Sequence, residues 1–390
     1  MAEPHAVVVG GGVGGLAAAL ALHRIGWAVT VCERAPAVDP VDVGLTLAPN
    51  ALRALDTLDV GRDVRKGSVF QGLVSIRHRD GRWIVRTSEA DARQRFGDAV
   101  CVLRYAELAG ILLGRLPAGA VRTATRVTAV NPGDTRRPAQ VVTDAGELTA
   151  DLVVVADGAR STIRPELFLE HPGAVYAGFT CWRAIAPWSA DVVPEFGETW
   201  GQGGVAGVLP LSGGEVYCYA TVNSPAGAFA ADEKAELVRH LEGWPAPLPE
   251  LVAAARPESV VRMDIWHIDT PLPAYHKGRV ALLGDAAHAM TPNLGQGACQ
   301  AVEDAVVLAH HVSGSMAYVP TALQSYTDAR LPRTSGMVQR SAQLAEAVQS
   351  ESPFLTGVRD TLAGVVGRLA PHLLAHYIRP VSDWHPPVDA

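Results

Sequence analysis

The sequence predicts an α/β fold in which a buried parallel sheet is interrupted by an antiparallel insertion. Short, almost wholly apolar runs at Ala6–Val9, Leu152–Ala156 and Val280–Leu283 are each followed by glycine, directly or after one aspartate, as is typical of buried parallel strands that end in tight turns. By contrast, Leu73–Thr87 alternates apolar and polar residues around Asp80-Gly81, which indicates an antiparallel hairpin. A chain of 390 residues that is 48% hydrophobic can bury more than one domain core.

The composition excludes several classes of partner. The net charge is −7 and no block of Lys or Arg stands out, so neither nucleic acid nor an anionic membrane is an expected partner. The apolar run Ala6–Leu22 follows "MAEPH", which lacks the basic start of a signal peptide, and no run of about 20 apolar residues predicts a membrane span. The cysteines form no CxxC pair, so we expect a reduced, cytoplasmic protein without a metal site. They are Cys32, Cys101, Cys181, Cys218 and Cys299.

The first glycine-rich turn has the spacing of a dinucleotide-binding fingerprint. "GGGVGG" stands between the strand Ala6–Val9 and an apolar helix predicted over Leu16–Ile25. Gly10, Gly12 and Gly15 occupy the G-x-G-x-x-G positions, which serve the tight turn, the approach of the backbone to pyrophosphate, and the packing of helix on strand. The start of the helix supplies free N–H groups for phosphates.

An acidic residue completes this fingerprint. Glu33 follows a second apolar strand, Ala28–Cys32, at the position that accepts hydrogen bonds from a ribose. An acid there disfavours a 2′-phosphate, so the N-terminal site is predicted to hold FAD or NAD and not NADP. Arg34 comes next, and its side chain either faces the adenosine or is solvated.

Two further strands end in a carboxylate beside a glycine, at Asp157-Gly158 and at Gly284-Asp285. Ligands of open α/β sheets lie at the carboxyl ends of the strands. One such Asp usually only forms a turn, but two of them together with the fingerprint indicate one long ligand that crosses the sheet. In addition, a helix is predicted over Cys101–Leu116. Arg104 near its start is either solvated or held by an anion or a ring oxygen.

The combined motifs resemble the class A FAD-dependent aromatic hydroxylases, the para-hydroxybenzoate hydroxylase group of flavoprotein monooxygenases. The matching stretches are the fingerprint with Glu33, "DGARSTIR" (Asp157–Arg164) and "GDAAHAMTPNLGQG" (Gly284–Gly297), in the expected order. The stretch "GFTCWRAIAP" (Gly178–Pro187) is most similar to the short bacterial branch that contains salicylate-, urate- and tetracycline-hydroxylase-like enzymes.

The resemblance implies where FAD lies. Glu33 would bind the adenosine ribose, Arg104 would lie near the ribityl chain and pyrophosphate, and Asp285 would bind the ribityl hydroxyl. The turn after Pro292 would aim a helix N-terminus at the flavin ring. His288, Glu303 and Asp304 are expected to be structural. The residues implied in cofactor binding are Gly10, Gly12, Val13, Gly14, Gly15, Glu33, Arg34, Arg104, Val127, Asp157, Asp285, Pro292, Gly295, Gly297 and Ala298.

The family also implies a domain plan. It consists of a Rossmann-like parallel sheet of the glutathione-reductase type that binds FAD, an inserted antiparallel-sheet substrate domain, and C-terminal helices. We expect the FAD domain at 1–70, 99–172 and 276–345, the substrate domain at 71–98 and 173–275, and the helical segment at 346–390.

The substrate pocket is predicted less sharply. Its expected walls are Trp182, Trp200, Leu209, Tyr217, Tyr219 and Pro292, although each aromatic residue is as readily explained by ordinary core packing. Tyr217 and Tyr219 share one face of a strand and could both bind a phenol. No catalytic base is identified, and the candidates are Arg183, Tyr217, Asp264 and His267. Urate-acting relatives are expected to carry an Arg where this chain has Gly203, Gly204 and Val205, which disfavours a urate-like anion.

The activity that the resemblance implies is single-component monooxygenation. NADH or NADPH, bound transiently, would reduce FAD, and O2 would form a peroxide at flavin C4a that hydroxylates a phenolic or heteroaromatic small molecule. Alternatives on the same fold are an alkene epoxidase or a decarboxylating hydroxylase. A non-oxygenase FAD-binding redox protein is a third, but the intact "PNLGQG" loop disfavours it. The chain is expected to be a monomer or a homodimer.

Overall fold

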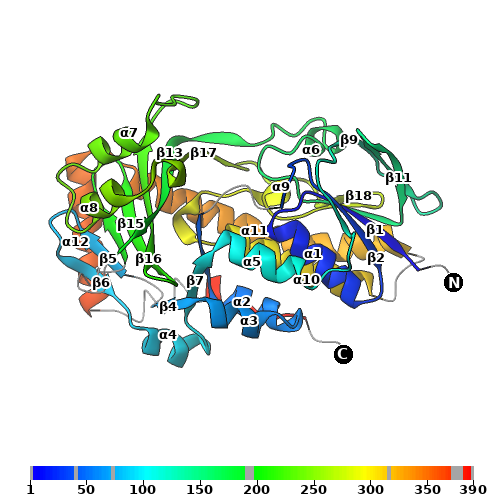
Figure 1. Ribbon diagram of the computed structural model, residues 1–390, viewed down its shortest axis with the longest axis horizontal. Helices are drawn as coiled ribbons and strands as arrows, with labels where there is room; N and C mark the ends of the chain where they lie inside the picture. The colour runs from blue at the N-terminus through cyan, green and yellow to red at the C-terminus, as the bar shows by residue number, and fades with distance from the viewer. Residues whose placement is uncertain are drawn as a thin grey trace.

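The computed structural model describes residues 3–38, 43–71, 75–188, 197–313, 318–369 and 381–387. The molecule is elongated, with a mainly parallel sheet at one end and a large antiparallel sheet at the other (Figure 1). The predicted C-terminal segment 346–390 lies partly outside the described residues. Within it, α12 (Pro353–Leu369) is described.

A six-stranded sheet with the order β18-β19-β12-β1-β2-β8 forms the first end. Its central pairs, β1 with β2 and β12, and β12 with β19, are parallel, as the apolar runs predict. These central strands are almost fully buried because α1 (Val13–Arg24) and α10 (Gly297–Val312) pack against one another on one face. The strands are β1 (His5–Val9), β2 (Ala28–Cys32), β8 (Val121–Arg122), β12 (Leu152–Val155), β18 (His276–Lys277) and β19 (Val280–Leu282).

Two small antiparallel sheets flank this layer. One has the order β11-β10-β9 and contacts β1 and β12, and the other has the order β3-β7-β4. Helices α2 (Pro49–Thr57), α3 (Gly61–Gly67) and α4 (Glu89–Phe96) accompany the second sheet. The strands are β3 (Gly44–Leu47), β4 (Val69–Gln71), β7 (Val100–Arg104), β9 (Val127–Asn131), β10 (Ala139–Thr143) and β11 (Gly146–Ala150).

The helix predicted over Cys101–Leu116 is wrong in its first turn. Residues Val100–Arg104 form β7, which pairs with both β3 and β4, and α5 begins only at Tyr105 and ends at Leu113. Cys101, Val102 and Leu103 are completely buried between these neighbours, so tertiary pairing overrides the helical pattern. Arg104 is therefore the last residue of a strand and caps the helix that follows.

The second end of the molecule is a seven-stranded sheet with the order β17-β13-β16-β15-β14-β5-β6. The hairpin predicted around Asp80-Gly81 is confirmed as β5 and β6. All strands come from the ranges expected for the substrate domain, although the domain boundaries themselves stay a prediction. The strands are β5 (Ser75–His78), β6 (Trp83–Arg86), β13 (Val175–Pro187), β14 (Gly197–Trp200), β15 (Val205–Leu211), β16 (Glu215–Asn223) and β17 (Val261–His267).

The two faces of the large sheet have different neighbours. Ala184, Val208 and Cys218 belong to a core cluster with α7 (Glu233–His240) and α8 (Leu248–Ala254), which cover the outer face (Figure 1). On the other face, Ile185 and Leu209 pack against Val102 of β7. We call this second side the inner face, because it is turned toward the parallel sheet and the long helix α11 (Val319–Val348).

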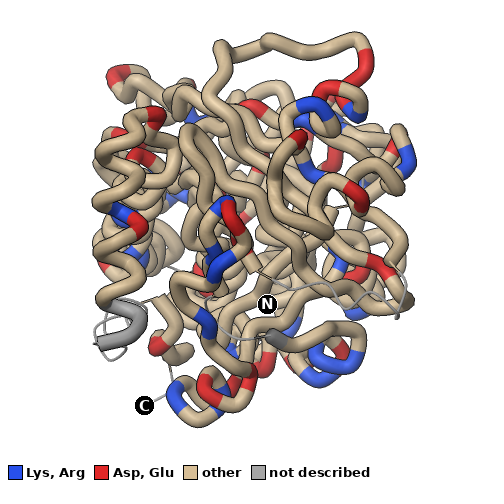
Figure 2. Tube along the Cα trace, turned by 90° about the vertical axis from the view of Figure 1, so that its left-hand side faces the viewer, with Lys and Arg blue, Asp and Glu red and all other residues tan. Residues whose placement is uncertain are grey.

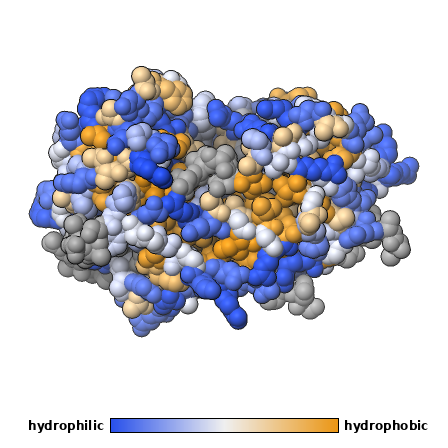
Figure 3. Space-filling model, in the orientation of Figure 1, coloured by the Kyte–Doolittle hydropathy of each residue, from blue (hydrophilic) through white to orange (hydrophobic). Residues whose placement is uncertain are grey.

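The surface carries charges of both signs. Lys and Arg are interspersed with Asp and Glu along the chain in the view of Figure 2. Apolar side chains gather in the middle of one face, over α1 and α5, between more hydrophilic ends (Figure 3). Within the part of the chain that the structure describes, no helix has the length and hydropathy that crossing a membrane requires.

Candidate functional site

The fingerprint turn joins β1 to α1 with very little space around its glycines. Gly10 has a φ of +107°, and a Cβ there would lie 2.4 Å from the Ala156 carbonyl oxygen. A Cβ on Gly15 would lie 2.0 Å from the Gly10 carbonyl oxygen, and one on Gly14 would lie 2.9 Å from Leu283 Cδ2. Side chains at these positions would push α1 away from the strands. Glycine therefore holds the start of α1 at the carboxyl end of the sheet.

Glu33 closes the other side of this turn. Its carboxylate accepts hydrogen bonds from the N–H groups of Gly11 and Ala35, each at 2.7 Å. The acid thus lies against the fingerprint loop, where an adenosine ribose is expected. Arg34 is exposed, and Val127 is buried at the start of β9. Their contacts with the nucleotide stay predictions.

Tyr105, the first residue of α5, also belongs to this turn and was not predicted. Its hydroxyl oxygen accepts a hydrogen bond of 2.8 Å from the N–H of Val13 at the start of α1. A Cβ on Gly12 would lie 3.0 Å from the same oxygen. The only sequence signal was its place directly after Arg104. The Tyr105 hydroxyl therefore lies where the fingerprint N–H groups would meet a pyrophosphate.

Asp157 follows β12 and has one unused oxygen. Its Oδ2 accepts the N–H of Thr162 at 2.9 Å, whereas its Oδ1 is buried and has no hydrogen-bond partner among the described residues. Arg164 fixes this turn by donating to the carbonyl oxygens of Ala286 and Ala159, at 3.0 and 2.9 Å. The second strand end is thereby linked to the third, because Ala286 directly follows Asp285.

Asp285 begins the short helix α9 (Asp285–His288) after β19. Its side chain is solvent-accessible, yet surrounding protein is close enough for burial to raise the pKa of its carboxyl group, against the opposing influence of His288 and Arg183. The carboxylate points toward the first residue of α10, since a Cβ on Gly297 would lie 3.7 Å from Asp285 Oδ1.

The loop between α9 and α10 leaves backbone accessible beside Asp285. Gly295, Gly297 and Ala298 are partly or fully exposed, and Pro292 begins a 3-10 turn that ends at Leu294. Asn293 Oδ1 is buried without a partner among the described residues. The free N–H groups at the start of α10 make a site that favours negative charge.

A buried ionic network supports this loop from behind. Asp304 of α10 accepts hydrogen bonds from the Gly284 N–H (2.9 Å), His288 Nε2 (2.6 Å) and Arg330 Nε (2.6 Å). Arg330 also pairs with Glu303 at 2.6 Å. Burial opposes ionisation, but the charges of His288 and Arg330 and these hydrogen bonds outweigh it and lower the pKa of Asp304 to about 2. The three acids and bases expected to be structural thus hold the turn that carries Asp285.

Arg104 has a protein carboxylate as a partner. Its Nη2 donates to Oε2 of Glu215, the first residue of β16, and its backbone N–H donates to Glu107 at 3.0 Å. The sequence left open whether Arg104 is solvated or held by an anion or a ring oxygen. In the structure it is held by an anion, the carboxylate of Glu215. Its expected contact with flavin stays a prediction.

Several predicted pocket residues meet on the inner face of the large sheet. Leu209 and Tyr217 pack with Ile185, and with Val43 and Val102 from the other domain. Tyr219 lies next to Tyr217, with ring centroids 5.7 Å apart. Trp200 packs further out, against Ile84, Val205 and Val348. The inner face therefore brings Leu209, Tyr217 and Tyr219 toward the cofactor side, with Trp200 toward α11.

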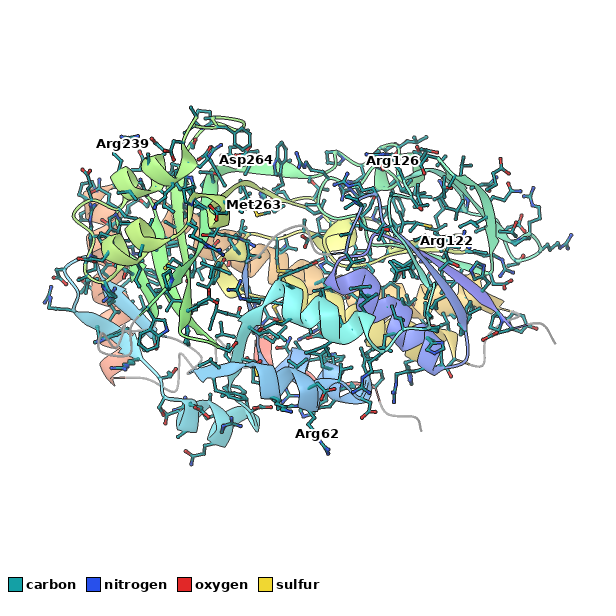
Figure 4. All side chains as sticks on the ribbon, viewed as in Figure 1. Arg62, Arg122, Arg126, Arg239, Met263 and Asp264 are labelled. Atoms are coloured by element: carbon teal, nitrogen blue, oxygen red, sulfur yellow. The ribbon has the colours of Figure 1, made fainter. Side chains whose placement is uncertain are left out.

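Two predicted residues are on the wrong face. Trp182 belongs to the core beneath α7 and α8, and its Nε1 donates to Glu233 at 2.8 Å. Asp264 lies on the same outer side, where it accepts the N–H of Gly227 at 2.7 Å, and Figure 4 labels it next to Met263, its neighbour in β17. Strand alternation places both opposite the pocket. We therefore correct the prediction: Trp182 does not line the pocket, and Asp264 is not a base there.

The three remaining candidate bases, Arg183, Tyr217 and His267, differ in how their surroundings shift their pKa values. Arg183 lies on the inner face, and Tyr217, Cys181 and Asp285 raise its pKa, so it stays a cation and cannot accept a proton. Burial lowers the pKa of His267, which leaves the imidazole neutral, and its Nδ1 has no partner among the described residues. Burial raises the pKa of Tyr217. The sequence also missed Glu198, an acid of β14 that accepts a hydrogen bond of 2.8 Å from the Tyr219 hydroxyl.

Comparison with known proteins agrees with this geometry. Residues 3–341 match the family described as FAD binding domain. The chain belongs to this FAD binding domain family. It is 36% identical over 359 residues to aurachin C monooxygenase/isomerase of Stigmatella aurantiaca, covering 91% of this chain and 92% of that protein. It is 32% identical over 373 residues to 2-heptyl-3-hydroxy-4(1H)-quinolone synthase of Pseudomonas aeruginosa, covering 92% and 94%.

A solved structure shares the whole fold. Klebsiella pneumoniae HpxO complexed with FAD and uric acid superposes with a TM-score of 0.86 at 28% identity, covering 97% of this chain and 96% of that one. The predicted family, fold class, cofactor FAD and enzyme class are thereby confirmed. The residues fit FAD as well: the glycine cradle, the unpartnered Asp157 Oδ1 and the enclosed Asp285 lie at successive strand ends of one sheet.

Proposed function

We propose that the chain is a single-component, FAD-dependent monooxygenase that uses NADH or NADPH and O2 to hydroxylate an aromatic small molecule. One observation carries the proposal. The accessible yet enclosed Asp285 and the start of α10 are adjacent, and Arg183 from the inner face of the large sheet lies within electrostatic reach of Asp285. The inner face also packs on Val43 and Val102 beside the FAD-binding sheets, so a ring bound between this face and the start of α10 would meet the cofactor.

Different residues would bind FAD, stabilise charge on its ring and exclude water. Bound FAD would accept a hydride from the nicotinamide and, once reduced, would activate O2 toward an electron-rich ring. Gly10, Gly15 and Glu33 would hold the ADP half, and Asp157 and Asp285 the rest of the chain. The start of α10 would stabilise negative charge on the ring by roughly 0.3–1 kcal/mol, or about 2 kcal/mol where partly buried. The apolar residues Leu209 and Tyr217 would exclude water.

A heteroaromatic substrate fits better than a simple phenol. Of the relatives described above, one is named for a 4(1H)-quinolone and another is complexed with uric acid, and both compounds are nitrogen heterocycles. Where urate-acting relatives are expected to carry an arginine, this chain has Gly203, Gly204 and Val205. That difference favours a ring without the charge of urate.

We also propose a setting for the enzyme. All five cysteines are buried free thiols, and burial raises the pKa of Cys101 to about 11 and that of Cys299 to about 12. Such thiols are inert and suit a reduced compartment, so a cytoplasmic location is proposed. The chain would act as a monomer or homodimer, with O2 and a small aromatic molecule as its partners.

The decisive experiment measures NADH and NADPH oxidation by the FAD-loaded enzyme across a panel of phenols and nitrogen heterocycles. We expect at least one ring compound to stimulate oxidation and to be recovered with one added oxygen. Hydrogen peroxide is measured in parallel. Oxidation that yields only peroxide with every compound would contradict the proposal and would favour a redox protein without oxygenase activity.

A further inference from the structure

A row of polar residues crosses the inner face of the large sheet. The register pairs Glu198 of β14 with Gly207 of β15, Gly207 with Tyr219 of β16, and Tyr219 with Arg183 of β13. Directly paired residues of neighbouring strands point to the same face. Three polar side chains and one glycine thus form a continuous line, which we call the polar row.

Gly207 allows the row to be continuous. A Cβ at this position would lie 2.2 Å from Tyr219 Cζ and 2.5 Å from its hydroxyl oxygen, so the tyrosine ring lies directly over the glycine. Across this gap, the Tyr219 hydroxyl reaches Glu198 Oε2 at 2.8 Å. Any larger residue would displace the ring and break the hydrogen bond. The glycine therefore places a tyrosine and a carboxylate side by side on a sheet face.

The direction of each hydrogen bond in the row is fixed by chemistry. Trp200 Nε1 donates to Glu198 Oε1 at 2.5 Å, and an indole N–H can only donate. The hydroxyl of Tyr219 donates to Oε2 of Glu198, and a carboxylate can only accept. The oxygen of Tyr219 is left with lone pairs and no proton to offer. Toward a ligand, Tyr219 is consequently a hydrogen-bond acceptor.

The other end of the row offers a donor. Arg183 Nε is buried and has no hydrogen-bond partner among the described residues. The side chain as a whole is half-buried, and a guanidinium can only donate, so its accessible N–H groups offer a donor to a ligand. Arg183 is also within electrostatic reach of Asp285, at the predicted flavin site. Ile185, the next residue of β13 on the same face, packs with Val43 and Val102, so the donor end of the row lies on the cofactor side of the sheet.

The side chains of the polar row are partly buried but remain accessible to solvent. Arg183, Glu198 and Tyr219 each keep some accessible surface. At the same time, burial raises the pKa of Glu198 and holds that of Tyr219 well above its usual range. Asp285 shows the same combination. The three side chains of the polar row are therefore reachable by a ligand on the inner face.

We propose that the polar row selects an uncharged ring that carries both an N–H donor and a carbonyl acceptor, the pattern of a pyridone or quinolone. The Tyr219 oxygen accepts the ring N–H, and Arg183 donates to the carbonyl oxygen. Glu198 is a positioning residue, because it acts through Tyr219 by fixing the direction of its hydroxyl. A benzoate would bring its carboxylate toward Glu198 and is rejected. This inference rests on the proposed function and names the substrate class of the same site.

Two probes of similar shape test the direction of the hydrogen bond. 4(1H)-Quinolone offers an N–H at the ring nitrogen, whereas 4-methoxyquinoline offers a lone pair there. Binding to the FAD-loaded enzyme is followed at pH 8 through the perturbation of flavin absorbance. The wild type should bind the quinolone about three- to tenfold more tightly, which is the value of one hydrogen bond.

Glu198→Gln should reverse this preference. Its amide oxygen must accept from Trp200, because the indole can only donate, so the amide NH2 faces Tyr219. The Tyr219 hydroxyl then turns and donates to the ligand, which favours 4-methoxyquinoline. Tyr219→Phe should remove the part of the preference that depends on the ring nitrogen and leave only the difference between a carbonyl and an ether oxygen at Arg183. Tyr176→Phe is the matched control, since it removes a tyrosine hydroxyl that donates to Ser224 elsewhere in the sheet, and it should keep the wild-type order.

Each outcome decides the inference. A reversal in Glu198→Gln with an unchanged Tyr176→Phe supports it, because a merely structural defect would weaken both probes alike. Equal affinity of the two probes for the wild type, no binding of either, or a parallel loss in Glu198→Gln overturns it. The proposed function fails separately, when no ring compound of the panel is hydroxylated.

Discussion

At the scale of single residues, Asp285 is the side chain that we expect to contribute most to FAD binding. Its carboxylate is enclosed enough for burial to raise its pKa, and no hydrogen bond to it is found among the described residues. A ligand hydroxyl could donate to this carboxylate, and a hydrogen bond to a charged group is among the stronger ones in proteins.

Asp285→Ala should therefore weaken FAD binding. A hydrogen bond to a charged group contributes about 1.5–3 kcal/mol, which corresponds to an increase in Kd of roughly ten- to 150-fold. Titration of the apoprotein with FAD, followed by flavin fluorescence, measures the change. Glu147→Ala removes an exposed carboxylate from β11 and should leave the Kd unchanged. An unaltered titration curve for Asp285→Ala would remove this residue from the site.

Local sequence patterns identified candidate cofactor residues in the turns, but they did not show which side chains of the large sheet lie on its inner face. Gly10, Gly15 and Asp285 are recognisable because each obeys a rule within its own turn. Trp182 was assigned to the wrong face because the register of a strand decides which side chains point to which face of the sheet. The sequence of one strand alone does not determine that register. Glu198 became visible only through its pairing with Gly207 and Tyr219, which lie on two other strands.

At the scale of elements, α10 and α11 are joined by buried charges. Arg330 of α11 is fully buried and contacts both Glu303 and Asp304 of α10, at 2.6 Å each. Asp304 in turn holds the Gly284 N–H, so the long helix is coupled to the turn that presents Asp285. The sequence placed both acids deep in a helix, but their partner lies 26 or 27 residues away in another element, beyond the reach of local patterns.

Arg330→Met should destabilise the protein strongly. The substitution preserves much of the volume but leaves two carboxylates buried without their cation, and breaking a buried pair in this way costs about 3–5 kcal/mol. The free energy of unfolding is measured by urea titration. Arg239→Met is the matched control, because Arg239 pairs with Glu236 on the exposed side of α7 and surface pairs contribute about 0–1 kcal/mol. Equal losses in the two variants would show that the network is not a stabilising element.

At the scale of the whole molecule, we expect FAD to join distant parts of the chain. Most of the predicted FAD contacts come from four segments: the turn after β1, Glu33 with its neighbour, the end of β12, and the loop before α10 with its first residues. Each segment is fixed by its own strand end, but only the glycine turn, Asp157 and Asp285 taken together would bind a molecule as long as FAD. The parallel order of the sheet followed from the sequence because buried parallel strands are continuous apolar runs. The path by which the antiparallel sheet meets that layer did not follow, because it depends on contacts such as Tyr217 against Gly44.

Removal of FAD should therefore lower the stability of the entire chain. A ligand that binds only the folded state stabilises it by about 2.7 kcal/mol at a concentration of about a hundred times its Kd. For a chain of this size, such a gain should raise the Tm by several degrees. Thermal unfolding is followed for the apoprotein with increasing FAD, and Tm should rise with the logarithm of the FAD concentration. The same series on Asp285→Ala should be displaced to higher FAD concentration by the factor found in its titration. A Tm that does not respond to FAD in the wild type would mean that the four segments are already locked without the cofactor and would contradict its role in joining them.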